Sequence, residues 1–314
     1  MPRVLLITTG GTIASGLAER GMGHGSDLLA AMPEAVRDVE FELVDLFSLP
    51  SSQIGPAEML QLSREANRRL ASGGYAGCVV THGTDTLEET AIFLDLLHQS
   101  ELPLVVTGAM RSGHEVGPDG PSNLQMAMTV CLDAAARDRG VMVVLNEQIH
   151  AARYVAKTHS KDVSTFRSPD AGPIGLVYAG RVTWIVPPDP GRRSQLTVAE
   201  IKGRVDLVKA YAGADGTLIE SAVAAGAGAL VVEAMGVGNL PMGMAVALGE
   251  AARRGLVVAI ATRCGSGPVV VGSRLQEAGV LAAGPGLNGQ KARMVLLAAL
   301  SAGLDREEIS RLLA

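Results

Sequence analysis

Residues 77–107 read GCVVTHGTDTLEETAIFLDLLHQSELPLVVT. An apolar run at Gly77–Thr81 is followed by a helix-length amphipathic stretch at Leu87–Leu97, and a second apolar run comes at Leu104–Thr107. Short apolar runs that alternate with amphipathic stretches are typical of β-α-β units around a parallel sheet. This stretch therefore predicts an α/β fold.

The same alternation extends on both sides of this unit. The expected strands and helices of the first half are residues 4–8, 42–46, 56–71, 122–136 and 141–145. Two later runs, 174–178 and 182–186, are separated by Ala-Gly-Arg, which favours a β-hairpin. The alternation then resumes on a smaller scale beyond residue 205. The pattern predicts a larger N-terminal parallel-sheet domain, flavodoxin-like in type, and a smaller C-terminal α/β domain.

A proline-rich segment separates the two halves. Three prolines within residues 187–190 are followed by Gly-Arg-Arg, and such a run cannot continue a strand or a helix. We therefore expect an N-terminal domain over residues 1–187, a linker over 188–204 and a C-terminal domain over 205–314.

Composition excludes several classes of protein. The 314 residues carry a net charge of −5 and only 3% aromatic side chains, which argues against a nucleic-acid partner. Three widely spaced cysteines form no Cys-x-x-Cys pair, and we expect no metal and no cofactor. No apolar stretch is long enough to cross a bilayer, so we expect no membrane partner and a cytoplasmic location.

Residues 284–289 fit the dinucleotide fingerprint formally, but we interpret them as a turn that opens the next helix.

Candidate chemistry lies where the expected strands end, because ligands of open parallel sheets bind beyond the carboxyl ends of the strands. The first strand ends in Thr8-Thr9-Gly10-Gly11-Thr12. Two glycines permit a tight turn with exposed amides, and the Thr12 hydroxyl could then face a bound carbonyl. On spacing alone, a phosphate-binding loop or a plain turn is a slightly better explanation of these five residues.

A second candidate follows the strand that ends at Thr81. Asp85 or Thr84 is suited to cap the following helix, with Glu88 in a capping-box position. The same Thr-Asp pair is also placed to hold an amino-acid ligand, with the carboxylate facing its ammonium group. Lys157 is a solvated charge if it stands alone. If it is buried beside Thr84 and Asp85, desolvation favours a usable base and the Asp85 carboxylate opposes this effect, so the sequence leaves the net direction open.

Two segments together resemble a known family. Residues 8–14, TTGGTIA, and 81–90, THGTDTLEET, are similar to the two signatures of bacterial L-asparaginases. The resemblance covers nearly the whole chain and includes residues 108–111, 119–124, 157–166, 236–239 and 287–293.

The resemblance implies a nucleophilic mechanism. Thr12 would attack the side-chain amide carbon of asparagine and release ammonia, and water would then hydrolyse the β-aspartyl ester. Thr84, Asp85 and Lys157 would form the supporting set, in which Lys157 tunes Thr84 and Asp85 binds the substrate ammonium group.

The resemblance also implies substrate contacts and an oligomer. Ser52 and Gln53 match positions that hold the substrate's α-carboxylate and ammonium groups, and Ala109 would add a backbone contact. The family completes each site with a residue of a neighbouring subunit, and Asn239 matches such a position. We therefore expect a homotetramer or homodimer with intersubunit active sites. Glu277 is a candidate for the acidic residue that the neighbouring subunit supplies.

One departure from the family concerns the loop after the nucleophile. Relatives carry a tyrosine there that assists proton transfer, but residues 13–40 contain none. The loop is rich in glycine, as a flexible lid would be. We hypothesise that His24 replaces the tyrosine, because histidine titrates in a suitable range.

Other functions stay open at this point. One is a broader asparaginase-glutaminase, or a hydrolase of D-asparagine or a substituted amide. Another is a catalytically silent amino-acid sensor that binds its ligand through Ser52, Gln53 and Asp85. A nucleotide-binding flavodoxin-like module is a third reading, which rests on fold analogy alone.

Overall fold

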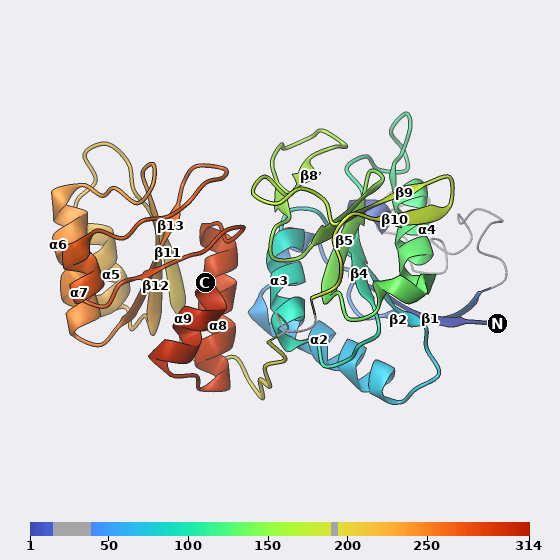
Figure 1. Ribbon diagram of the computed structural model, residues 1–314, viewed down its shortest axis with the longest axis horizontal. Coiled ribbons are helices and arrows are strands. Elements are labelled where there is room, and N and C mark those ends of the chain that lie inside the picture. Colours follow the sequence, from blue (N-terminus) through green and yellow to red (C-terminus); the bar gives the residue numbers. More distant parts are fainter. Residues whose placement is uncertain (15–38, 190–193) are drawn as a thin grey trace. The chain divides into compact units, whose positions relative to one another are not determined.

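The computed structural model describes residues 1–14, 39–189 and 194–314 (Figure 1). The chain divides into two compact units, unit 1 (Met1–Gln195) and unit 2 (Leu196–Ala314). The expected α/β class is confirmed, with a large, mainly parallel sheet in unit 1 and a smaller parallel sheet in unit 2. The domain bounds given above stay predictions.

Unit 1 is built on an eight-stranded sheet in the order β10-β9-β6-β5-β4-β3-β1-β2. Its strands are β1 (Arg3–Thr8), β2 (Glu40–Asp45), β3 (Gly77–Thr81), β4 (Leu104–Thr107), β5 (Val141–Leu145), β6 (Gln148–Ala151), β9 (Gly175–Tyr178) and β10 (Arg181–Trp184). Five neighbouring strands, β2, β1, β3, β4 and β5, run parallel. The other three strands, β6, β9 and β10, pair antiparallel with their neighbours. The expected hairpin is thus confirmed as β9–β10.

Helices cover both faces of this sheet (Figure 1). Side chains alternate between the faces of a strand, so Leu5 of β1 packs in one core and Val4 in the other. The first core also contains residues of α2 (Pro56–Ala71) and α3 (Leu87–Leu97). The second contains residues of α4 (Gly120–Leu132).

The helix expected over residues 122–136 is wrong at its end. α4 ends at Leu132, and a separate 3-10 turn, η4 (Ala134–Ala136), follows it. The Asp133 carboxylate accepts a hydrogen bond from the backbone N–H of Ala135 at 2.7 Å. This local bond competes with the helix and starts the new turn.

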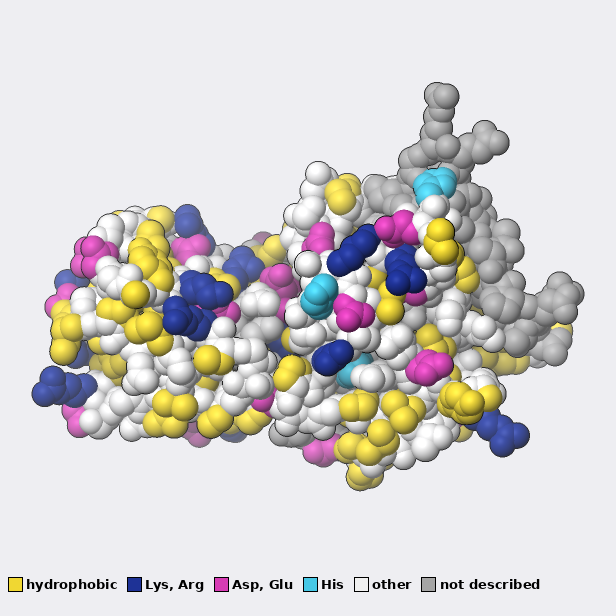
Figure 2. All heavy atoms as spheres, turned by 90° about the horizontal axis from the view of Figure 1, so that it is seen from above, with side chains coloured by type: hydrophobic (Ala, Val, Ile, Leu, Met, Phe, Trp, Pro, Cys, Tyr) yellow, Lys and Arg dark blue, Asp and Glu magenta, His cyan; other side chains and the backbone are white. Residues whose placement is uncertain are grey.

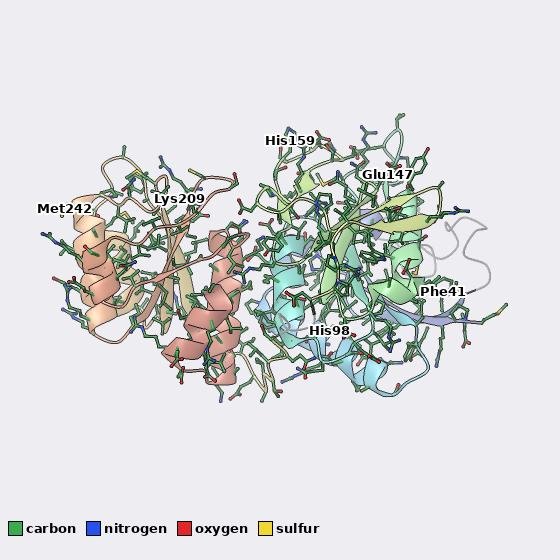
Figure 3. All side chains as sticks on the ribbon, in the orientation of Figure 1. Phe41, His98, Glu147, His159, Lys209 and Met242 are labelled. Atoms are coloured by element: carbon green, nitrogen blue, oxygen red, sulfur yellow. The ribbon has the colours of Figure 1, made fainter. Side chains whose placement is uncertain are left out.

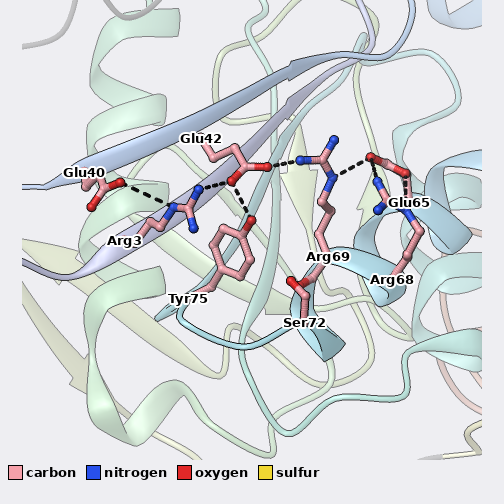
Figure 4. A network of polar contacts seen from close by, with 8 residues as sticks. All are labelled: Arg3, Glu40, Glu42, Glu65, Arg68, Arg69, Ser72 and Tyr75. Atoms are coloured by element: carbon pink, nitrogen blue, oxygen red, sulfur yellow. Dashed lines mark hydrogen bonds and ion pairs between the residues drawn. The ribbon is translucent and has the colours of Figure 1, made fainter.

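A polar network holds the sheet edge formed by β2 (Figure 4). The Glu42 carboxylate accepts hydrogen bonds from the guanidinium groups of Arg3 and Arg69. It also accepts the Tyr75 hydroxyl proton at 2.6 Å. Because Arg69 belongs to α2 and Arg3 to β1, the network joins the edge strand to its neighbouring strand and to a covering helix.

Unit 2 has a four-stranded parallel sheet in the order β11-β12-β13-β14. The strands are β11 (Val205–Lys209), β12 (Ala229–Ala234), β13 (Val257–Thr262) and β14 (Leu281–Ala282). The helices are α5 (Thr217–Ala224), α6 (Met242–Arg253), α7 (Ser273–Glu277), α8 (Gly289–Ala302) and α9 (Arg306–Leu313). Asn288 caps α8 by accepting the Lys291 N–H at 3.1 Å, which confirms residues 284–289 as a turn that opens a helix. None of the described helices is long and apolar enough to cross a bilayer.

Candidate active site

The site is framed by backbone and hydroxyl groups where β1, β3 and β4 end. The Thr9 hydroxyl donates to the Thr81 carbonyl oxygen at 2.9 Å, and the N–H of His82 donates to the Thr107 carbonyl oxygen at 2.8 Å. Thr9 and Thr81 are fully buried. These bonds join neighbouring strands beyond the regular ladder and fix the edge from which the loops start.

Two glycines bring the turn before Thr12 against the loop after β3. Gly11 has a φ of +84°, and a Cβ on it would lie 2.4 Å from the Gly83 Cα. A Cβ on Gly83 would lie 2.6 Å from the Ser51 Oγ. Only residues without a side chain allow the two backbones and the Ser51 side chain to approach so closely. The turn that leads to Thr12 therefore lies directly beside the loop that carries Thr84.

Lys157 joins the two polar residues of that loop. Its Nζ donates to Thr84 Oγ1 at 2.9 Å and to Asp85 Oδ1 at 2.8 Å. Thr84 is buried, and 17% of the Lys157 side chain is exposed against 67% of the Asp85 side chain. The lysine is therefore screened from water on the Thr84 side, while the carboxylate remains accessible to a ligand.

The first turn of α3 contributes a contact that sequence reasoning missed. Glu88 is buried, and its Oε2 accepts the backbone N–H of Lys157 at 2.7 Å. Sequence reasoning gave Glu88 a capping-box role with Asp85 or Thr84, and this expectation is wrong. The N-cap of α3 is Thr86, which makes no side-chain capping bond.

Ser51 is a second residue that sequence reasoning missed. Its buried hydroxyl accepts the backbone N–H of Asp85 at 3.1 Å, and its carbonyl oxygen accepts the Thr86 hydroxyl proton at 2.7 Å. Ser52 and Gln53 follow it in the 3-10 helix η3 (Ser51–Gln53), and both are exposed. The only sequence signal for Ser51 was its place beside them.

The backbone around Ala109 is fixed by side chains of α4 and its N-cap. The Asp119 carboxylate accepts the N–H groups of Met110 and Arg111 at 3.1 and 2.9 Å. The Asn123 amide donates to the Gly108 carbonyl oxygen at 3.0 Å. Ala109 itself is buried, so its backbone is held on both sides.

His82 supports the same loop as a neutral imidazole. Its Nδ1 lies 2.6 Å from the Gly83 carbonyl oxygen, and its Nε2 lies 3.0 Å from the Thr90 hydroxyl. A carbonyl can only accept, so Nδ1 carries the proton and Nε2 accepts from Thr90. Burial lowers the pKa of His82 to about 4, although the bond to Gly83 opposes this shift.

Three other predicted residues are not among those described above. Asn239 and Glu277 belong to unit 2, where both are exposed. The backbone of Asn239 closes a turn with Met235, through N–H···O bonds of 2.9 and 2.8 Å. His24 lies outside the described residues. Over residues 1–14, 39–189 and 194–314, no group of three His, Cys, Asp or Glu side chains is placed to hold a metal ion.

Together these features define an α/β protein with a hydroxyl- and carboxylate-lined site at the carboxyl edge of a parallel sheet. The chain belongs to the asparaginase family, whose members hydrolyse asparagine to aspartate and ammonia. Residues 3–189 match the family described as asparaginase, N-terminal, and residues 204–313 match the glutaminase/asparaginase C-terminal domain.

Individual relatives cover almost the whole chain. A probable L-asparaginase of Deinococcus radiodurans is 39% identical, over 99% of this chain and 97% of the relative. An L-asparaginase of Bacillus licheniformis is 36% identical, over 96% and 97%. The crystal structure of a probable cytoplasmic L-asparaginase from Campylobacter jejuni superposes with a TM-score of 0.86 at 32% identity, over 100% of this chain and 99% of that one. Two relatives from Pseudomonas are named glutaminase-asparaginase.

Proposed function

We propose that this chain hydrolyses L-asparagine to L-aspartate and ammonia, with Thr12 as the nucleophile. The observation that carries the proposal is the position of Lys157 Nζ, within hydrogen-bond distance of both Thr84 Oγ1 and Asp85 Oδ1. A lysine that touches a buried hydroxyl can exchange protons through it, while a neighbouring exposed carboxylate offers a site for an ammonium group.

The reaction runs in two balanced steps. The Thr12 oxygen attacks the side-chain amide carbon of asparagine, the hydroxyl proton is passed to the amide nitrogen, and ammonia leaves a β-aspartyl ester. Water then attacks the ester carbon, the Thr12 oxygen regains a proton, and aspartate is released. The Thr84–Lys157 pair moves the proton in each step, and Asp85 holds the ammonium group of the substrate.

Other residues would position the substrate. The exposed Ser52 and Gln53 lie one and two residues after Ser51, whose hydroxyl is bonded to the Asp85 backbone. This arrangement supports a role for them in binding the α-carboxylate and ammonium groups. The fixed backbone at Ala109 supports a further contact. His24 stays the proposed replacement for the loop tyrosine.

The proposal is tested by ammonia release from L-asparagine, L-glutamine and D-asparagine, with Thr12→Ala and Thr12→Ser enzymes alongside the unchanged protein. We expect turnover of L-asparagine that is abolished by Thr12→Ala and partly kept by Thr12→Ser, which retains a hydroxyl. L-Glutamine is longer by one methylene, which is worth only about 1–3 kcal/mol of discrimination in a pocket. The names of the two Pseudomonas relatives favour some glutaminase activity as the second candidate function. Lack of turnover, with aspartate still raising the melting temperature, would overturn the proposal in favour of a sensor.

We also propose that the protein assembles as a homotetramer or homodimer whose sites include Asn239 of a second copy. Val237 and Met242, near Asn239 in the sequence, are exposed in unit 2 to 49% and 75%, and Val270 is exposed to 60%. Val270 lies beside Val237, because its N–H donates to the Val237 carbonyl oxygen. Met242 begins α6, as Figure 3 shows. Exposed apolar groups of this kind favour an interface.

Mixing inactive subunits tests the shared site. If Asn239 serves the site of its neighbour, mixed oligomers of Thr12→Ala and Asn239→Ala subunits regain part of the activity that each variant lacks. If oligomers shown by mass to be mixed regain no activity, this result contradicts intersubunit sites.

The Campylobacter relative, described as cytoplasmic, supports a cytoplasmic location for this chain.

A further inference from the structure

Lys157 lies on a strand that is not part of the eight-stranded sheet. It ends β7 (Ala156–Lys157), which pairs with β8 (Phe166–Arg167) in a two-stranded ribbon outside the eight-stranded sheet. The ladder that fixes β3 and the loop after it therefore does not fix Lys157. Phe166, which pairs with Lys157, and Val155, which precedes β7, pack in one core of unit 1. Contacts of the ribbon with α3 and with that loop add to this hold and set the position of the lysine.

Glu88 makes such a contact from a rigid element. It lies in the first turn of α3, whose Leu87, Ala91 and Leu94 pack in one core of unit 1. Its carboxylate is buried, and Oε2 lies 2.7 Å from the backbone nitrogen of Lys157, 69 residues further along the chain. Hydrogen bonds with a charged acceptor are shorter and stronger than neutral ones.

Residues 84–88 consequently bind Lys157 both at its backbone and at the end of its side chain. The side-chain Nζ meets Thr84 and Asp85, and the backbone N–H meets Glu88. The Lys157 side chain thus links the backbone bond to Glu88 with the bond to the Thr84 hydroxyl. A shift of β7 away from α3 would therefore carry Nζ away from Thr84.

We propose that Glu88 is a positioning residue that anchors the Lys157 backbone so that Nζ reaches the Thr84 hydroxyl. The inference rests on the proposed function, since it assigns Glu88 a part in the same reaction. Glu88 acts through its hydrogen bond to the backbone and not by touching the substrate. The rate of the chemical step then depends on a hydrogen-bond acceptor at the end of the side chain of residue 88. Substrate affinity depends on this acceptor much less.

Three substitutions at Glu88 separate these effects. Glu88→Gln keeps an acceptor oxygen at the same reach, Glu88→Asp withdraws it by one methylene, and Glu88→Ala removes it. A displacement of about 1 Å in an active site costs about a hundredfold in rate. We therefore expect kcat for L-asparagine to fall at least about tenfold in Glu88→Asp and Glu88→Ala. KM should change less than about threefold, and Glu88→Gln should recover most of kcat.

Glu89→Ala is the matched control, because Glu89 lies in the same helical turn and is only half-buried. Its kcat should equal that of the unchanged protein. If Glu88→Ala does not fold, the comparison of Glu88→Asp with Glu88→Gln decides. Equal kcat in these two variants, or unchanged kcat in a folded Glu88→Ala, overturns the inference.

Hydrogen exchange tests the contact apart from activity. The Lys157 amide should exchange faster in Glu88→Ala than in Glu89→Ala, and an unchanged exchange rate also overturns the inference. If the unchanged protein releases no ammonia from any amide, the proposed function fails. The anchoring of Lys157 by Glu88 is then still decided by the exchange measurement.

Discussion

Gly11 and Gly83 touch through their backbones, so that a methyl group on Gly11 would lie 2.4 Å from the Gly83 Cα. Gly11→Ala should therefore destabilise the protein by more than about 2 kcal/mol, because the strain of a positive φ adds to a clash between two backbones. Gly73→Ala is the control, since Gly73 has a φ of +79° and open space around it. Urea unfolding of both variants checks this, and equal losses would show that the clash is relieved at no cost.

Lys157→Met should lower kcat by about 10²–10⁴-fold, the usual contribution of a positioned proton-transfer group. The lysine meets the buried Thr84 hydroxyl, and methionine keeps its length without its proton. Lys161→Met is the control, because Lys161 forms an exposed ion pair with Glu115. Figure 2 shows that charged side chains gather over one face of unit 1. Steady-state ammonia release measures both variants, and similar rates for the two would contradict a role for Lys157.

Stability should fall as the pH drops from about 6.5 towards 4. Burial lowers the pKa of His82 and of His150 to about 4 in the folded chain. Across this window the unfolded chain binds protons that the folded chain does not, so the stability from neutral imidazoles is complete above pH 6.5 and lost below it. The loss is roughly 3 kcal/mol at most for each histidine.

Urea unfolding at several pH values checks this dependence. His150→Gln should flatten the fall between pH 6.5 and 4.5, because one of the two buried imidazoles is gone. His114→Gln, at an exposed position, should leave the slope as it is. A slope that His150→Gln does not change would rule out this source of the pH dependence.

Glu42→Ala should destabilise the protein by about 2–3 kcal/mol, because it leaves charged and hydroxyl donors without their acceptor. Glu42 accepts from Arg3, Arg69 and Tyr75, and only 19% of its side chain is exposed. Glu101→Ala breaks an exposed pair with Arg137 and should cost at most about 1 kcal/mol. Thermal unfolding compares the two, and equal losses would mean that the network in Figure 4 adds nothing beyond one surface pair.

Ala179→Asn should stabilise the β9–β10 hairpin by up to about 1 kcal/mol. Ala179 and Gly180 have φ values of +49° and +72°, as in a type I′ turn, where Asn-Gly is the favoured pair. Ala135→Asn, in η4 at an exposed position outside the positive-φ region, should give no gain. A lower melting temperature for Ala179→Asn would refute the turn assignment.

Hydrophobic periodicity predicted most of the buried elements, but it missed β6, whose Ile149 and His150 are fully buried. The bounds of β3, α3 and β4 match the apolar and amphipathic runs of residues 77–107, since local sequence alone determines which face is apolar. The ribbon β7–β8 was not predicted. Two-residue strands have no period to detect, and their pairing depends on tertiary contacts.

The candidate site likewise contains residues that could be predicted from the sequence and a contact that could not. Resemblance to a family led to Thr84, Asp85 and Lys157, and the structure brings these three together. The contact from Glu88 to Lys157 joins residues 69 positions apart and replaces a local capping bond. Local propensity predicted the cap because it contains no information about a distant amide that offers a better donor.

The two units share no apolar core in the described part of the chain. Among the described residues, no member of the core of unit 2 belongs to either core of unit 1. Separate cores favour separate cooperative melting transitions, so calorimetry could resolve two peaks where a single-core protein gives one. A ligand held only by loops of unit 1 would then shift one peak to higher temperature. A ligand that shifted both peaks would reveal unit 2, through Asn239, as part of the binding site.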